Sequence, residues 1–209
     1  MVQILKINPL QPDSTVIQRA RKMIIDCKLV VFPTDTVYGL AADPFNENAV
    51  MNLINAKKRS IEKGLPILVG TLEIAMGLVE FSPLAMSVAS QFWPGALTLV
   101  LPLKKSMLNQ VTGNRKTLGI RVPNHEVARQ LAEIPIIGTS ANISGQKSPI
   151  TAEEALKQLG DSVELVLDCG PTMEGLPSTV LDLSGENPQL LREGTIKFAQ
   201  LEPFFTPIS

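Results

Sequence analysis

The feature that most limits the fold of this 209-residue chain is its alternation of short apolar runs with longer segments of helical period. Apolar runs of about four or five residues, bounded by turn residues, are typical of buried strands. Such runs occur at 29–32, 65–69, 97–101, 118–122, 134–137, 164–168, 179–183 and 189–192. Strands interleaved with helices predict a single-domain α/β fold with a twisted open sheet. Because the last three runs have no helix between them, we expect a mixed sheet.

Segments with apolar residues every three or four positions predict the helices packed on this sheet. Ser14 and Asn46 are placed to cap two of them, and Thr151 with Glu154 forms a capping-box pattern for another. The predicted helices cover 14–27, 46–57, 71–80, 82–92, 125–133 and 151–159. The sequence has no internal repeat and no linker rich enough to divide it, so we expect one domain over residues 1–209.

Composition excludes several classes of protein. The chain has 19 Lys+Arg against 20 Asp+Glu and a formal net charge of −1, which argues against a protein that coats nucleic acid through bulk charge. Cys27 and Cys169 are too few for a disulfide framework, and we expect both to be small buried hydrophobes. The single histidine, His125, excludes a His-rich metal centre, and its place at a helix start indicates a surface or capping role.

Targeting signals are also missing from the sequence. The N-terminal segment lacks a signal-peptide pattern, and no apolar stretch approaches the ~20 residues that span a bilayer. We therefore expect a cytoplasmic protein with no membrane partner.

The standard nucleotide-binding and hydrolase motifs do not occur. There is no G-x-x-x-x-G-K-[ST], no G-x-G-x-x-G and no G-x-S-x-G, and one histidine argues against a Ser-His-Asp triad. Any chemistry must therefore depend on cations, hydroxyl groups and backbone amides.

Two polar segments follow predicted strands. The first, 33–40, carries Thr34, Thr36 and Tyr38, and ligands of open α/β sheets bind beyond the carboxyl ends of strands. The alternative is a turn whose Thr side chains satisfy the local backbone. The second, 138–148, is rich in Gly, Ser, Thr and Asn, and is either an anion-binding nest of backbone amides or an ordinary polar loop.

Basic residues gather in one helix end and in two apolar strands. Lys57, Arg59 and Lys63 either complement a helix dipole or grip phosphate. Arg121 and Arg192 are either buried and paired or face outward from half-exposed strands. Taken together, these segments predict a concave, cationic, hydroxyl-rich cleft that suits a polyanion plus a small carboxylate.

With these segments established, the chain resembles the L-threonylcarbamoyladenylate synthase family in its short, single-domain, YrdC-like form. The similarity runs from about Leu29 to Arg192, with a domain core of about 14–200, and its seven blocks follow the family order. These blocks are Pro33-Thr-Asp-Thr-Val-Tyr-Gly-Leu40, Lys57-x-Arg59, Phe92-Trp-Pro-Gly-Ala-Leu-Thr98, Gly119-Ile-Arg-Val-Pro123, Ser140-Ala-Asn-Ile-Ser-Gly145, Ser178-Thr-Val180 and Leu191-Arg-x-Gly194.

The resemblance implies a nucleotidyltransferase reaction in which L-threonine, bicarbonate or CO2, and ATP give threonylcarbamoyl-AMP and pyrophosphate. Partner proteins, the threonylcarbamoyl transferase machinery, would then use this intermediate to modify adenosine 37 of tRNA. Such a reaction needs positioning and charge stabilisation more than a protein nucleophile. Mg²⁺ is expected to be bound through the ATP phosphates, with no dedicated metal-binding residues.

The resemblance also implies three sets of site residues. Those expected in catalysis are Lys57, Arg59, Ser140 and Asn142. Those expected to hold threonine are Thr36, Tyr38, Arg121 and Ser178. Those expected to hold ATP are Arg59, Lys63, Thr117, Ser140, Ser148 and Arg192.

The chain departs from the family pattern in two places. Leu68 stands where some long relatives carry a His that touches threonine, and the second domain of the long members is not expected here. The main alternative function is an RNA-binding or ribosome-maturation factor that uses the same concavity for tRNA or double-stranded RNA without catalysis. A further alternative is a paralogue for another nucleotide or acyl acceptor, against which the intact Ser140-x-Asn142 pair counts.

Overall fold

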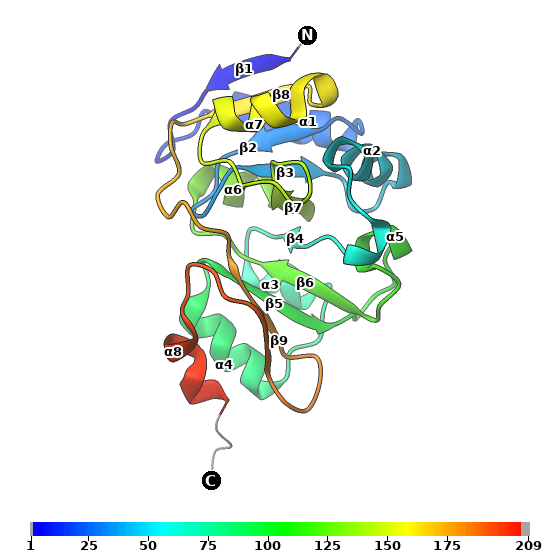
Figure 1. Ribbon diagram of the computed structural model, residues 1–209, viewed down its shortest axis with the longest axis vertical. Helices are drawn as coiled ribbons and strands as arrows, with labels where there is room; N and C mark the ends of the chain where they lie inside the picture. The colour runs from blue at the N-terminus through cyan, green and yellow to red at the C-terminus, as the bar shows by residue number, and fades with distance from the viewer. Residues whose placement is uncertain (1, 206–209) are drawn as a thin grey trace.

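In the computed structural model, which describes residues 2–205, ten strands form one sheet in the order β1-β8-β2-β3-β7-β4-β6-β5-β9-β10 (Figure 1). The strands are β1 (Gln3–Lys6), β2 (Val30–Phe32), β3 (Gly39–Ala42), β4 (Ile67–Leu68), β5 (Leu97–Pro102), β6 (Thr117–Arg121), β7 (Ile136–Ser140), β8 (Leu165–Asp168), β9 (Thr179–Asp182) and β10 (Gln189–Arg192). Four neighbouring pairs are parallel and five are antiparallel. The prediction of an α/β fold with a mixed sheet is therefore confirmed.

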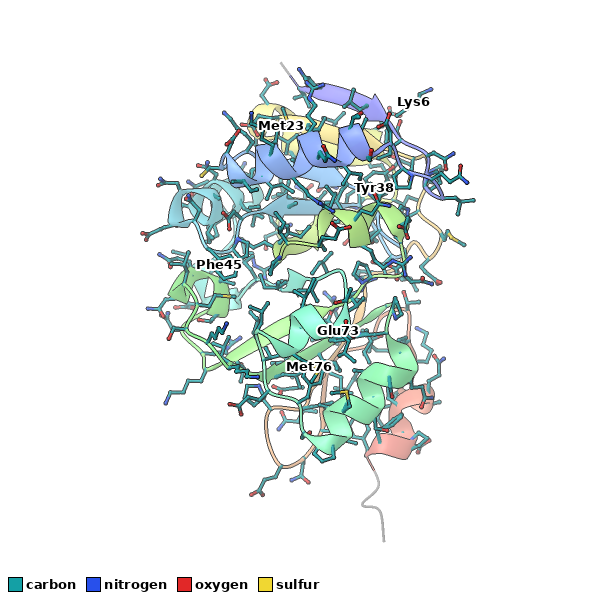
Figure 2. The ribbon with its side chains drawn as sticks, turned by 180° about the vertical axis from the view of Figure 1, so that it is seen from behind. Lys6, Met23, Tyr38, Phe45, Glu73 and Met76 are labelled. Carbon is teal, nitrogen blue, oxygen red and sulfur yellow. The ribbon has the colours of Figure 1, made fainter. Side chains whose placement is uncertain are left out.

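Helices cover both sides of this sheet. They are α1 (Ser14–Ile25), α2 (Glu47–Lys57), α3 (Leu72–Met76), α4 (Pro83–Phe92), α5 (Asn109–Thr112), α6 (Glu126–Leu131), α7 (Ala152–Leu159) and α8 (Phe198–Leu201). At the β1 end, α7 lies in front of the sheet in Figure 1 and α1 lies behind it. Seen from behind in Figure 2, α1, α6 and α4 face the viewer. Across the described residues, no helix has the length and apolar character needed to cross a membrane.

Side-chain caps fix where several helices begin. Asp13, rather than the predicted Ser14, caps α1 by accepting the Thr15 amide at 2.8 Å. Asn46 caps α2 as predicted. Before α7, Thr151 Oγ1 accepts the Glu154 amide at 3.1 Å, and the Glu154 carboxylate accepts the Ile150 amide at 2.8 Å. The predicted capping box thus forms with one difference: the Glu154 carboxylate accepts the amide of Ile150 and not that of the N-cap residue Thr151.

Strand alternation divides the central sheet into a core face and a polar face. Leu118 and Ile120 of β6 enter the larger hydrophobic cluster, which also contains residues of α2, α4 and α7. Thr117, Gly119 and Arg121 point to the other face, because successive side chains of a strand alternate. A smaller hydrophobic cluster packs α1 and α6 against β2, β3, β4, β7 and β8.

Two strands are present that the sequence pattern did not predict. β1 has a largely exposed edge sequence, and β3 is Gly-Leu-Ala-Ala, whose small residues have low strand propensity. β3 forms because it pairs on both sides, with β2 and with β7, and all four of its residues are buried there.

The expectations for the cysteines and the histidine need correction. Cys27 and Cys169 are free thiols that are only partly buried, since one follows the end of α1 and the other follows β8. His125 occupies the N-cap position of α6, but its side chain makes no capping hydrogen bond. Its ring is partly buried instead, with Nε2 3.9 Å from the Cys169 sulfur, and burial lowers its pKa.

Candidate functional site

A cavity of about 530 Å³ lies on the polar face of the central strands. Strand register explains how its floor is assembled, because paired residues on neighbouring strands share one face. The floor residues are Gly138 and Ser140 of β7, Leu68 of β4, Thr117, Gly119 and Arg121 of β6, Thr98 and Val100 of β5, and Val180 and Asp182 of β9. The walls come from the 34–37 turn, from the segment between α2 and β4, and from β10.

Leu68 lines this floor and also belongs to the smaller hydrophobic cluster. A Cβ atom on Gly138 would lie 2.2 Å from Leu68 Cγ, so only glycine at position 138 leaves room for this side chain. Leu68 is 3% exposed. The position where the family pattern has a His is thus occupied by an apolar side chain that faces the cavity.

Arg121 is the most deeply placed cation of the cavity. Its Nη2 lies 2.5 Å from Asp35 Oδ1, its Nη1 donates to Thr36 Oγ1 at 3.0 Å, and its Nε donates to the Gly95 carbonyl at 2.7 Å. Arg121 is 5% exposed and Asp35 is 8% exposed, so the pair is buried. Burial lowers the pKa of Arg121, and the Asp35 charge opposes this effect. Of the two sequence interpretations, the buried and paired one is confirmed, and two of the five guanidinium N–H groups remain for a ligand.

The turn between β2 and β3 supplies both local and ligand-facing hydroxyls. Thr34 Oγ1 donates to the Val37 carbonyl at 2.6 Å and lies 2.9 Å from Thr36 Oγ1. The Glu174 and Gly175 amides donate to the carbonyls of Asp35 and Thr36 at 3.3 and 3.1 Å, respectively. The predicted local role of the Thr side chains therefore holds for Thr34, while Thr36 lies against Arg121.

Four further cations, Arg59, Lys63, Arg115 and Arg192, line the cavity without a partner carboxylate among the described residues. Arg59 donates through Nη2 to the carbonyls of Lys63 and Gly64 at 2.8 and 2.9 Å. Arg192 donates through Nη2 to the Ser178 carbonyl at 2.8 Å, and Ser178 Oγ lies 2.9 Å from Thr98 Oγ1. Within residues 2–205, no carboxylate lies within 4.0 Å of Arg59, Lys63 or Arg192.

The unpaired cations affect one another. Burial and then the Arg192 charge lower the pKa of Arg59, and burial and then the Arg121 charge lower the pKa of Arg192. Arg59 Nε is also buried with no hydrogen-bond partner among the described residues. A bound anion would relieve the mutual repulsion.

Lys57 and Asn142 lie behind the cavity wall. The Lys57 ammonium donates to the backbone carbonyls of Ser140 and Asn142, and the side chain is 1% exposed. Asn142 Nδ2 donates to the carbonyls of Ile143 and Gln146 at 2.8 and 2.9 Å. Neither residue lines the cavity. Both hold the chain where it leaves β7, and Ser140 itself does line the cavity.

The expectation of an anion-binding nest after β7 is wrong for most of its amides. The amides of Ala141, Asn142, Ile143 and Ser144 donate to acceptors within the protein, namely Tyr38 O, Ser140 O, Gln158 Oε1 and Lys57 O. Ser148 lies beside a separate depression of about 420 Å³, against α7, and does not line the main cavity. The amides of this polar loop are thus used in hydrogen bonds within the protein. The positive charge of the cavity comes from Arg and Lys side chains instead.

Tyr38 also requires correction. Its side chain is fully buried, and its hydroxyl donates to the Gly170 carbonyl at 2.7 Å. Burial raises its pKa above the ordinary value. Figure 2 labels Tyr38 in the half of the molecule that contains α1 and α6. Tyr38 therefore ties β3 to the end of β8 and does not line the cavity.

The predicted residues thus divide into two groups. Those that the fold brings to one cavity are Thr36, Arg59, Lys63, Thr117, Arg121, Ser140, Ser178 and Arg192. Those that it does not are Tyr38, Lys57, Asn142 and Ser148. Sequence reasoning missed Asp35, Arg115 and Asp182. Asp35 lies inside the polar segment already selected, and an acid beside a buried arginine is the signal that would have found it.

Comparison with known proteins identifies the family of this chain. A family model named Sua5_yciO_yrdC, with the description "Telomere recombination", matches residues 22–194. Threonylcarbamoyl-AMP synthase of Pyrococcus abyssi is 40% identical over 190 residues, which cover 89% of this chain and 56% of that protein. The Bacillus subtilis protein of the same name is 38% identical over 197 residues, which cover 92% and 57%, respectively.

A solved structure extends the agreement to the fold. The crystal structure of P. abyssi Sua5 complexed with L-threonine matches this chain with a TM-score of 0.91 and 37% identity, covering 97% of this chain and 61% of the other. The chain therefore spans less than two thirds of the length of these relatives. Each of these matches includes most of this chain. The chain belongs to the Sua5/YciO/YrdC family, as the motifs in its sequence predicted.

Proposed function

We propose that this protein condenses L-threonine, bicarbonate or CO2, and ATP into threonylcarbamoyl-AMP and pyrophosphate. The observation that carries the proposal is one cavity holding a buried arginine with free N–H groups, Arg121, next to the unpaired cations Arg59, Lys63 and Arg192. A site of this kind suits a small carboxylate beside a polyphosphate. The names of the P. abyssi and B. subtilis relatives support the same activity.

The threonine half of the site would centre on Arg121. Its two remaining N–H groups are oriented by Asp35, Thr36 and Gly95, so they can form a fork for the substrate carboxylate. The Thr36 and Ser178 hydroxyls line the same region. Leu68 would contact the substrate as an apolar wall. The complex of P. abyssi Sua5 with L-threonine supports placing this substrate in the family fold.

The ATP half would use Arg59, Lys63 and Arg192 for the phosphates, with Ser140 and Thr117 nearby. Among residues 2–205, no three His, Cys, Asp or Glu side chains gather to bind a metal ion. We propose that Mg²⁺ enters with the nucleotide, bound through its phosphate oxygens.

The proposed chemistry uses a substrate nucleophile. The threonine amine attacks CO2 and gives up a proton to solvent, which forms a carbamate; with bicarbonate as the source, that proton leaves in the water molecule that is released. A carbamate oxygen then attacks the α-phosphorus, and the bond to the β,γ-pyrophosphate breaks. The arginines would stabilise charge on the phosphate oxygens and hold the two reactants together. No protein nucleophile is needed, which agrees with a cavity lined by cations and hydroxyls.

The product would leave for the tRNA-modifying threonylcarbamoyl transferase machinery in the cytoplasm. This assignment of partner and location follows from the proposed reaction. The RNA-binding alternative is not favoured, because the P. abyssi and B. subtilis relatives carry the synthase name.

The proposal is tested by incubating the purified protein with L-threonine, bicarbonate, Mg-ATP and pyrophosphatase. We expect threonylcarbamoyl-AMP, detected by chromatography and mass spectrometry. Arg192→Gln should lower kcat/KM by at least ~10-fold, the scale of one lost charge-assisted contact. Arg19→Gln, on the exposed surface of α1, is the matched control and should leave the rate unchanged. Failure of the folded wild-type protein to form product would overturn the proposal.

A further inference from the structure

One carboxylate stands apart in the cationic cavity. Of the described residues that line it, Asp182 is the only Asp or Glu, against Arg59, Lys63, Arg115, Arg121 and Arg192. Asp182 lies at the end of β9, where it pairs in register with Val100 of β5. It forms no ion pair with any cation of the described chain within 4.0 Å. Asp182 is therefore not a counter-ion that neutralises the site.

The orientation of this carboxylate is set by one neighbour. Asp182 Oδ1 accepts the Ser184 amide at 2.8 Å and the Ser184 hydroxyl at 2.6 Å. No described residue donates to Oδ2. One oxygen is thus held by the protein, and the other has no donor among the described residues, on a side chain that lines the cavity.

The surroundings of Asp182 differ from those of the cations. Val100 and Val180 lie on the same sheet face beside it, and Leu191, 55% exposed, lines the same cavity from β10. Apolar side chains around one hydrogen-bond acceptor suit a flat heterocycle that carries an N–H donor. A phosphate would be repelled here, because it would meet an unpaired negative charge.

We propose that Asp182 determines nucleotide specificity by accepting a hydrogen bond from the exocyclic amine of the base. This inference deepens the proposed function and rests on it for the identity of the nucleotide as ATP. Adenine offers an N6 amine at the position where hypoxanthine offers an O6 acceptor. A site that provides only an acceptor favours the first base; with the second, the carboxylate is covered by the base and left without a hydrogen-bond donor.

The substitution Asp182→Asn gives a specific reversal. The two Ser184 donors need an oxygen, so Oδ1 of the new amide stays with them and its NH2 group turns to the cavity. The site then offers a donor in place of an acceptor. The variant should therefore prefer inosine triphosphate, whose O6 accepts, over ATP.

The test is isothermal titration calorimetry of the intact protein with ATP, inosine triphosphate and purine riboside triphosphate, which lacks the amine. We expect wild-type protein to bind ATP at least ~10-fold more tightly than either analogue, the effect of one unsatisfied buried group. In Asp182→Asn the ratio of the inosine to the adenosine dissociation constant should fall by at least ~10-fold. Asp43→Asn is the matched control, since Asp43 accepts the Phe45 amide in the same local geometry but outside the cavity.

Each alternative outcome decides the matter. An unchanged ratio in the folded Asp182→Asn protein would overturn the inference, as would a shifted Mg²⁺ requirement with no change of base preference, which would assign Asp182 to the metal. Asp182→Ala, judged for folding by circular dichroism, should abolish the preference for ATP over purine riboside triphosphate. Binding selectivity is measured without turnover, so a protein that selects ATP but forms no product would contradict only the proposed function.

Discussion

At the residue scale, the two buried cations near the cavity are stabilised differently. Arg121 has a carboxylate partner, Asp35, whereas Lys57 is held only by backbone carbonyls. Burying a charge without an opposite charge is costly, and it shifts the equilibrium toward the neutral form. The two residues should therefore respond differently to mutation and to pH.

Removal of the Asp35 charge should destabilise the fold. Asp35→Asn keeps the side-chain size but leaves Arg121 as an uncompensated buried charge, which costs about 3 kcal/mol in comparable pairs. Urea denaturation measures the loss, with Asp26→Asn on the surface after α1 as a control that should stay within about 0.5 kcal/mol. The double variant Asp35→Asn/Arg121→Met removes both charges and should recover much of the stability. A double variant no more stable than Asp35→Asn would contradict this account.

Lys57 should make stability depend on pH in the neutral to basic range. Burial first, and the Arg59 charge second, lower the pKa of Lys57 from 10.5 to about 7. Between these values the unfolded chain binds a proton that the folded protein has released, so stability rises with pH, by at most ~1.4 kcal/mol per pH unit. Below pH 7 both states hold the proton, and the full cost of the buried charge is present.

The variant Lys57→Met removes this dependence. Urea midpoints measured from pH 6 to pH 9 should rise for the wild-type protein relative to the variant above pH 7, and the two curves should be parallel below it. Parallel curves over the whole range would show that Lys57 keeps its ordinary pKa.

At the element scale, the sequence pattern predicted helices and strands well where periodicity was strong. All eight predicted strands are present, and β1 and β3 were missed because one is an exposed edge and the other consists of small residues. The site was predicted less completely, since a motif identifies a segment but not the direction of each side chain. Lys57 and Tyr38 lie in segments whose neighbouring residues line the cavity, yet tertiary packing buries both side chains away from it.

The glycine that follows β10 illustrates a constraint set by two elements together. A Cβ atom on Gly194 would lie 2.1 Å from the Pro177 carbonyl oxygen, and the Gly194 amide donates to Thr179 Oγ1 at 2.9 Å. Gly194→Ala should therefore push β10 away from the start of β9 and cost about 1–3 kcal/mol. Because Arg192 and Ser178 lie on these segments, ATP binding should weaken as well.

A glycine in the same hairpin provides the control for this prediction. Nothing lies within 4 Å of a Cβ atom built on Gly185, so Gly185→Ala should be neutral within about 0.5 kcal/mol. Thermal unfolding and calorimetry of both variants make the comparison. Equal stability of the two variants would contradict the close-approach argument.

At the scale of the whole molecule, the near-zero net charge conceals a local excess of positive charge. The formal net charge is −1, yet the cavity gathers Arg59, Lys63, Arg115, Arg121 and Arg192 from distant parts of the chain. A polyanion should therefore stabilise the folded protein far more than bulk composition implies.

Thermal unfolding with added nucleotide measures this effect. Ligand at 100 times its dissociation constant adds about 2.7 kcal/mol of stability, so ATP should raise the unfolding temperature by several degrees. AMP, with fewer charges, should raise it less at equal concentration, and added NaCl should reduce both effects. An equal response to ATP and AMP would contradict phosphate binding by these cations.

The strand order has a consequence for how this chain folds while it is being synthesised. β8 lies between β1 and β2, and β1 pairs with no other described strand (Figure 1). Both N-terminal strands emerge from the ribosome early, but their shared partner, Leu165–Asp168, emerges on the order of ten seconds later at ~5–20 residues per second. Until then the edge of β2 that pairs with β8 stays open to other chains. The joining of β1 to β2 through β8 is therefore a late step of folding.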